Sequence, residues 1–201
     1  MVDASSRSSD GYYQIQNFVK DVIRGLRIGD DGSRIAYGMF TDEANIQFDF
    51  DAYETKMELV NAVSFPHEYG ITNTTSALEL VLNQGFQNAR ENSRKIVVLI
   101  VDGRGIDHDT AFYLASQVKE QGITILGVGV NTGGRFGRQE LMSLTSDPDD
   151  LNFLEAESYT ELSRHVDTLV ENLCKGVCYF YLKHPGPKDQ YYVTYFKILR
   201  I

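Results

Sequence analysis

Continuous apolar runs alternate with periodic apolar segments along most of this chain. Residues 96–101 form a run of six apolar residues that leads into Asp102, and residues 123–130 form a second run. Runs of this kind are typical of strands that are covered on both faces of a parallel sheet. Apolar residues at three- and four-residue spacing predict amphipathic helices over 15–26, 55–63, 78–89, 110–121, 139–144 and 159–173.

Two further segments predict a hairpin at one edge of the sheet. Residues 34–40 and 44–50 have the composition of strands, and the three residues between them are short enough to join them antiparallel. Residues 152–156 predict a last strand. Because strands and helices alternate from residue 46 onward, we expect an α/β fold. It is a doubly wound, mostly parallel central sheet with one antiparallel edge strand and helices on both faces.

The end of the chain departs from this alternation. Residues 177–183 and 190–201 are aromatic and β-branched, and the sequence His184-Pro185-Gly186-Pro187 separates them. This pattern predicts an appended β-hairpin. We therefore expect one domain over residues 1–175 and a C-terminal tail over residues 176–201.

Composition and charge narrow the functional classes. The 201 residues carry a formal net charge of −9, which argues against nucleic acid and anionic membrane surfaces as partners. No apolar run reaches membrane-spanning length, and the first residues lack the apolar core of a signal peptide. The four histidines are scattered, no nucleophile motif occurs, and the glycines of 123–130 suit turns better than a nucleotide loop. We therefore expect no enzymatic activity.

Hard oxygen donors gather in three loops at the ends of predicted strands. Asp3 and Ser5 lie in the first loop, Thr72 in the second and Asp102 in the third. Carboxylates and hydroxyls without His or Cys ligands suit Mg²⁺ or Mn²⁺. Taken alone, Asp102 has an equally good interpretation as a cap of the following turn.

These three loops resemble the von Willebrand factor type A domain family. Its metal-ion-dependent adhesion motif is Asp-x-Ser-x-Ser, followed by a Thr and an Asp on separate loops. Asp3-Ala4-Ser5, Thr72 with the helix after it, and the segment 98–104 match these parts in order. The sequence Ser146-Asp147-Pro148-Asp149 is similar to extracellular matrix members, and the resemblance extends from Asp3 to Cys174.

The resemblance implies a divalent cation held by Asp3, Ser5, Thr72 and Asp102. The third position of the serine motif is Arg7 rather than Ser. Ser8 takes this role if the loop is shifted by one residue. Asn73-Thr74-Thr75 is also a glycosylation sequon, and a glycan in this loop would obstruct the site, so we expect an unmodified Asn73.

The first strand of the family fold is a long apolar run, whereas only Met1 and Val2 precede Asp3 here. Burying about five apolar side chains is worth roughly 1.5–3 kcal/mol each, which is on the order of a whole domain's stability of about 5–15 kcal/mol. We expect the natural protein to continue upstream. The alternative is that residues 190–201 supply a substitute strand.

The two cysteines, Cys174 and Cys178, leave three interpretations open. In extracellular family members, flanking cysteines often pair across the two termini, which implies that Cys174 has a partner upstream. The others are a Cys174–Cys178 bond and two free thiols.

The resemblance implies an extracellular, non-enzymatic adhesion module of the matrix. It would bind a protein ligand, such as collagen or another matrix component, through the cation. The alternative is a metal-independent structural or assembly module in which Arg7 marks a degraded site. An intracellular hydrolase or nucleotide-binding protein of similar architecture has little support.

Overall fold

The computed structural model describes residues 1–4, 9–64, 70–91, 93–103, 105, 107–131 and 135–183. For residues 9, 10, 135, 136 and 175–183 only the backbone is described. In chain order the elements are β1 (Val2–Asp3), α1 (Ser9–Gly25), β2 (Tyr37–Phe40), β3 (Ala44–Phe48), α2 (Lys56–Ala62), α3 (Thr74–Asn83), β4 (Lys95–Val101), α4 (His108–Glu120), β5 (Ile123–Val130), α5 (Arg135–Leu144), α6 (Asp149–Asn152), β6 (Phe153–Ala156), the 3₁₀ helix η1 (Tyr159–His165) and α7 (Val166–Lys183).

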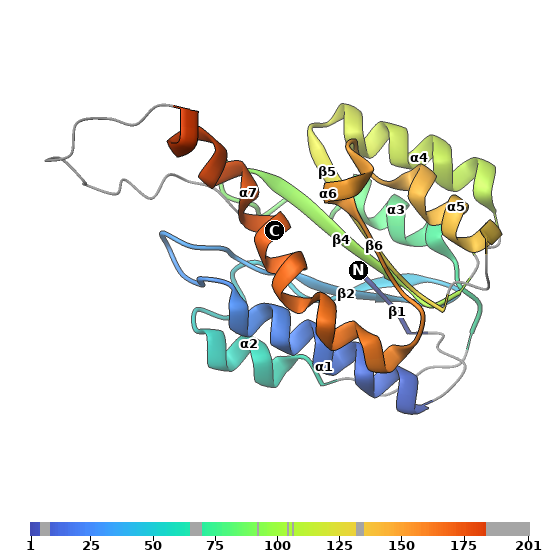
Figure 1. Cartoon of the computed structure of the whole chain (residues 1–201), viewed down its shortest axis with the longest axis horizontal. Helices are drawn as coiled ribbons and strands as arrows, with labels where there is room; N and C mark the ends of the chain where they lie inside the picture. Colours follow the sequence, from blue (N-terminus) through green and yellow to red (C-terminus); the bar gives the residue numbers. More distant parts are fainter. Residues whose placement is uncertain are drawn as a thin grey trace, which may run out of the picture.

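The strands form one six-stranded sheet in the order β3–β2–β1–β4–β5–β6. Every neighbouring pair is parallel except β2 and β3, which pair antiparallel at the edge. Helices α1, α2 and α7 lie on one side of the sheet, and α3, α4 and α5 lie on the other (Figure 1). The predicted fold class is therefore confirmed.

The side chains of strand β4 alternate between two hydrophobic cores, one on each face of the sheet. Ile96 and Ile100 point into the cluster formed with α1, α2 and α7. Val97, Leu99 and Val101 point into the cluster formed with α3, α4 and α5. Because successive side chains of a strand face opposite sides, a strand that is buried on both faces must be apolar at every position. This requirement explains the continuous apolar run.

Strand β1 occupies the centre of the sheet with only two residues. Val2 pairs with Met39 of β2 and with Ile100 of β4. The Met1 amino group donates a hydrogen bond of 2.8 Å to the carbonyl of Val98. Among the described residues, nothing pairs on the β1 side with the earlier part of β4, residues 95–97. The central strand is therefore as short as the sequence suggests.

An apolar cavity of about 110 Å³ continues from β1 through the sheet layer. We call it the central slot. Residues of β2 and β4 line its sides, while α1 and α7 close one face and α3 with the turn after it closes the other. The slot is therefore bounded by neighbouring strands and by helices of both faces of the sheet.

The slot also accounts for the late start of β2. The sequence predicts a strand from residue 34, but β2 begins at Tyr37. Residues Ile35 and Ala36 line the slot instead. A strand is defined by its ladder of hydrogen bonds, and β1 begins too late to continue that ladder along these residues.

Two other boundaries differ from the sequence predictions. Helix α3 ends at Asn83 instead of residue 89, because the amide of Gly85 bonds back to the carbonyls of Leu80 and Val81 and closes the helix there. Helix α7 continues to Lys183, so the strand predicted over residues 177–183 is wrong. The helical spacing of Leu169, Leu173 and Val177 continues with no proline to stop it. The rest of the expected hairpin, 184–201, lies outside the described residues.

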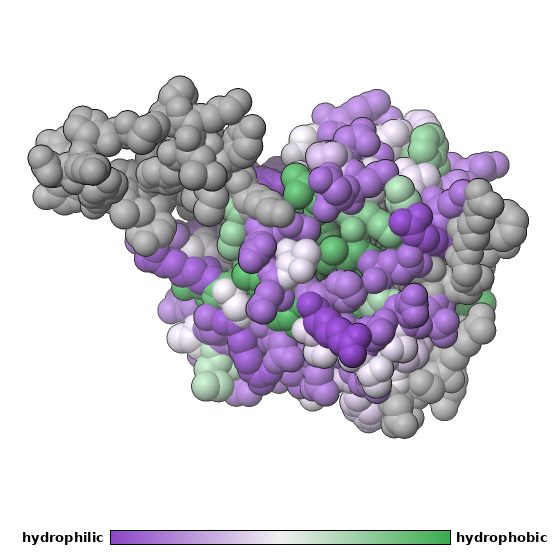
Figure 2. Space-filling view, in the orientation of Figure 1, coloured by the Kyte–Doolittle hydropathy of each residue, from purple (hydrophilic) through white to green (hydrophobic). Residues whose placement is uncertain are grey.

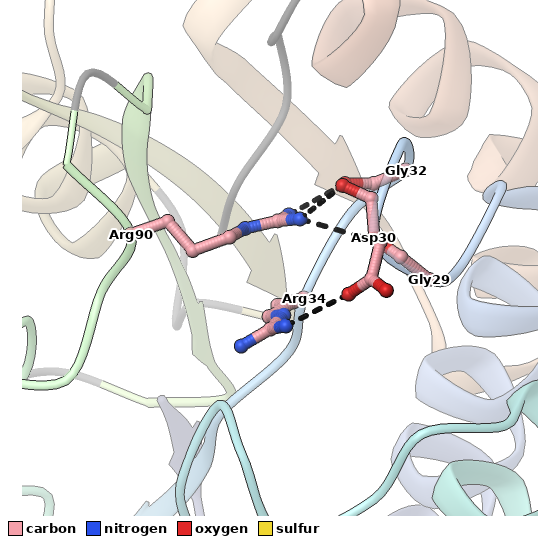
Figure 3. Close-up of polar contacts among 5 residues, drawn as sticks. All are labelled: Gly29, Asp30, Gly32, Arg34 and Arg90. Carbon is pink, nitrogen blue, oxygen red and sulfur yellow. Dashed lines mark hydrogen bonds and ion pairs between the residues drawn. The ribbon is translucent and has the colours of Figure 1, made fainter.

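Arg90 fastens the loop between α1 and β2 at the end of the sheet where the parallel strands begin. Its guanidinium donates hydrogen bonds to the carbonyls of Gly29, Asp30 and Gly32 (Figure 3). Arg34 of the same loop forms an ion pair of 2.9 Å with the Asp30 carboxylate. A planar guanidinium can serve several acceptors at once, so one side chain holds the whole turn.

The surface is predominantly hydrophilic in the view of Figure 2, with hydrophobic residues visible over the middle of the sheet, beside α7. None of the described helices combines the length and apolar character needed to cross a membrane.

Candidate metal site

Strands β1 and β4 lie side by side and carry two buried carboxylates at their carboxyl ends. Asp3 is the last residue of β1 and Asp102 follows β4, and their exposed fractions are 0% and 5%. Because Val2 pairs with Ile100, Asp3 lies beside the last residues of β4. The carboxyl ends of strands in an open α/β sheet are the usual position of a ligand.

The loop before α3 brings Thr72 to the same edge. Its hydroxyl donates a hydrogen bond of 2.9 Å to Oδ2 of Asp3. A β-carbon at Gly103, the residue after Asp102, would lie 3.0 Å from the Thr72 hydroxyl oxygen. Glycine therefore allows the third loop to approach the second closely. The structure thus brings Asp3, Thr72 and the Asp102 loop together, as the sequence predicts.

Helix α3 holds the Thr72 loop through its capping residue. The side chain of Asn73 accepts a hydrogen bond from the Ser76 amide, as an N-cap does, and its Nδ2 donates to the carbonyl of Asp42. Asp42 in turn accepts a bond of 3.0 Å from the amide of Ile71. These contacts assign Asn73 a structural role as the cap of α3, and its unmodified state stays a prediction.

Tyr159 is a site residue that the sequence analysis missed. It begins η1, just after the end of β6, and its hydroxyl donates a hydrogen bond of 2.7 Å to Oδ2 of Asp102. The available signal was its position, because β6 ends at the same edge of the sheet as β1 and β4. Aromatic residues in such a place are usually assigned to the core, and the hydroxyl contact is not visible in the sequence.

The donor set suits a hard divalent cation. A hydroxyl that donates its hydrogen to a carboxylate keeps oxygen lone pairs that can face a cation. Two carboxylates buried at one edge of a sheet repel each other unless a cation or hydrogen bonds offset the repulsion. The described residues contain no group of three or more His, Cys, Asp or Glu side chains arranged for a metal. A cation here would therefore depend on hydroxyl oxygens and water.

The remaining predicted ligands, Ser5 and Ser8, lie outside the described residues, as does Arg7. Their part in the site stays a prediction. Cys174 is half-buried and packs beside the core of α1 and α7, whereas the side chain of Cys178 is not described. The pairing of the two cysteines therefore also stays open.

The structure is a doubly wound α/β domain with buried oxygen donors from three loops at the carboxyl edge of its sheet. The chain belongs to the von Willebrand factor type A domain family, whose family model matches residues 1–168. The resemblance drawn from the three loops is therefore confirmed.

The relatives of this chain are extracellular matrix proteins. It is 30% identical over 191 residues to the collagen alpha-1(XII) chain of Notophthalmus viridescens, covering 92% of this chain and 20% of that protein. It is 27% identical over 176 residues to human vitrin, covering 87% of this chain and 25% of vitrin. The chain thus spans about a fifth to a quarter of the length of these relatives.

Among solved structures, proximal thread matrix protein 1 from the mussel byssus is similar to this chain. Its structure with a zinc-occupied MIDAS motif (the metal-ion-dependent adhesion site) superposes with a TM-score of 0.76 at 28% identity. The match covers 86% of this chain and 44% of that protein.

Proposed function

We propose that this chain is a non-enzymatic adhesion module of the extracellular matrix that binds a protein ligand through a divalent cation. The observation that carries the proposal is the meeting of Asp3, Thr72 and the Asp102 loop at the carboxyl edge of the sheet. The matrix relatives support the extracellular setting, and the zinc-occupied motif of the mussel protein supports cation binding.

In this proposal Asp3, Ser5, Thr72 and Asp102 hold the cation directly or through water, with Ser8 in place of the serine that Arg7 replaces. The bound cation would supply one open position for an acidic side chain of the partner. Mg²⁺ or Mn²⁺ fits this donor set, because both prefer oxygen ligands. Collagen or another matrix component is the proposed protein ligand.

Calorimetry with Mn²⁺ and Mg²⁺ tests the cation site directly. We expect saturable binding of one cation by the unaltered chain. Asp102→Ala should weaken binding by at least about tenfold, since even the partners that orient metal ligands contribute 10–100-fold. Asp51→Asn is the matched control, because Asp51 is exposed after the antiparallel strand β3, at the opposite end of the sheet.

Adhesion is tested by capturing the chain on immobilised fibrillar collagen with Mg²⁺ or with EDTA. The proposal expects retention that EDTA and Asp102→Ala both abolish. Retention that survives both changes would instead support the metal-independent module, and so would a chain that binds no cation at all.

A further inference from the structure

The contact between Tyr159 and Asp102 joins the last strand–helix junction to the third loop. The two residues are 57 positions apart, and the 2.7 Å distance is typical of a hydroxyl donating to a charged carboxylate. Asp102 is almost fully buried, so little water competes for this bond.

The ring of Tyr159 is held in one place by the helix beneath it. A β-carbon at Gly11 of α1 would lie 2.6–2.9 Å from three atoms of the ring, which is closer than real contacts allow. The ring also packs beside the core formed by α1 and α7. The hydroxyl therefore projects from a fixed platform of α1 and η1.

Asp102 lies where strand β4 no longer restricts its backbone, so a hydrogen bond from Tyr159 can fix the orientation of its carboxylate. The residue lies after the last residue of β4 and is followed by Gly103, so the ladder no longer restricts its backbone. The terminal torsion of an aspartate is broad rather than confined to narrow staggered wells. When Tyr159 engages Oδ2, the carboxylate plane is set and Oδ1 is directed elsewhere.

We propose that Tyr159 is a positioning residue for the cation site, which fixes the Asp102 carboxylate through Oδ2 and presents Oδ1 to the cation or its bound water. This inference rests on the proposed cation-binding function. Partners that orient a ligand from behind commonly change metal affinity 10–100-fold. A hydrogen bond that served only to satisfy a buried carboxylate would change stability equally with and without metal.

The test is Tyr159→Phe, which keeps the ring against Gly11 and removes only the hydroxyl. We expect Mn²⁺ affinity by calorimetry to fall about tenfold, with a smaller metal-induced rise in Tm. Tyr12→Phe is the matched control, because it removes a buried tyrosine hydroxyl that contacts Met39 Sδ in the core. That variant should bind Mn²⁺ as the unaltered chain does.

A double-mutant cycle keeps the test independent of folding effects. In an Asp102→Asn background, Tyr159→Phe should change Mn²⁺ affinity by less than about twofold, since the two residues then act as one unit. If the unaltered chain binds Mn²⁺ and Tyr159→Phe binds it equally well, the positioning role is wrong while the cation site stands. If the unaltered chain binds no Mn²⁺, the proposed function fails and this inference fails with it.

Discussion

At the scale of single residues, the amino group of Met1 occupies the least favourable environment for a charge. Burial lowers the pKa of this amino group from 8.0 to about 5, and the group lies at the mouth of the apolar slot. The folded chain therefore prefers the neutral amine, whereas the unfolded chain keeps a charged one up to about pH 8.

This difference predicts a pH dependence of stability. Between about pH 5 and pH 8 the unfolded state binds more protons, so the free energy of unfolding should rise with pH. The rise attributable to Met1 is at most about 4 kcal/mol, at 1.36 kcal/mol for each unit of pKa. Urea titrations at pH 5, 6, 7 and 8 measure it. An N-terminally acetylated chain should lose this component, and equal slopes for both forms would contradict the assignment.

Arg90 carries a second prediction at this scale. Arg90→Met should lower the free energy of unfolding by about 2–4 kcal/mol, because the carbonyls of Gly29, Asp30 and Gly32 lose charged donors. Arg90→Lys should recover only part of the loss, since a compact ammonium cannot reach all three carbonyls. Chemical denaturation of both variants measures the difference. Full rescue by lysine would show that charge, not the shape of the guanidinium, holds the loop.

The sequence predicted the positions of some of these functional residues but not of others. Thr72 and Asp102 could be placed at one edge because each precedes or follows a recognisable helix or strand. Asp3 was placed there by the family motif, since no strand is recognisable before it. Tyr159 and Arg90 could not be placed, because their roles depend on contacts across 57 or more positions. Local periodicity carries no information about such pairs.

At the scale of elements, the two-residue strand β1 is the weak point of the sheet. The cavity of about 110 Å³ beside it costs about 2–3 kcal/mol, at roughly 24 cal/mol per Å³. An extension of four apolar residues joined to Met1 supplies side chains for this space and removes the buried amine.

We therefore expect the extension Val-Ile-Val-Phe at Met1 to raise the free energy of unfolding by at least about 2–3 kcal/mol. Differential scanning calorimetry and urea titration measure the gain. The control extension Gly-Ser-Gly-Ser has the same length, removes the buried amine as well and adds no apolar side chains. At about pH 9, where the amine is neutral in the folded and the unfolded chain, it should therefore give less than about 1 kcal/mol. Equal gains from both extensions would mean that the slot does not take up a strand.

Helix boundaries show where patterns along the chain stop being informative. Helix α4 ends where predicted, because Gly122 has a φ of 75° that favours glycine. Helix α7 passes through the expected domain boundary after residue 175, because Gly176 is tolerated within a helix whose apolar spacing continues. A glycine marks a helix end only where the backbone takes up the left-handed conformation.

At the scale of the whole molecule, the alternation of buried strands and amphipathic helices was enough to predict the sheet and its antiparallel edge. The order of the strands was not derivable from periodicity, which does not say that β1 lies between β2 and β4. The structure supplied that step. The size of the slot followed only from the packed structure, since the helices of both faces determine how far the gap closes.

Strand β1 also connects the central slot with the proposed cation site. Val2 borders the slot, and the next residue, Asp3, belongs to the proposed cation site. A change that stabilises β1 on the side of the slot should therefore also fix the position of Asp3, the oxygen donor at the carboxyl end of the strand. Linkage requires the effect to be reciprocal: a chain with the Val-Ile-Val-Phe extension should bind Mn²⁺ more tightly, and Mn²⁺ should stabilise the extended strand by the same factor. Filling the central slot would thus tighten binding at the proposed cation site.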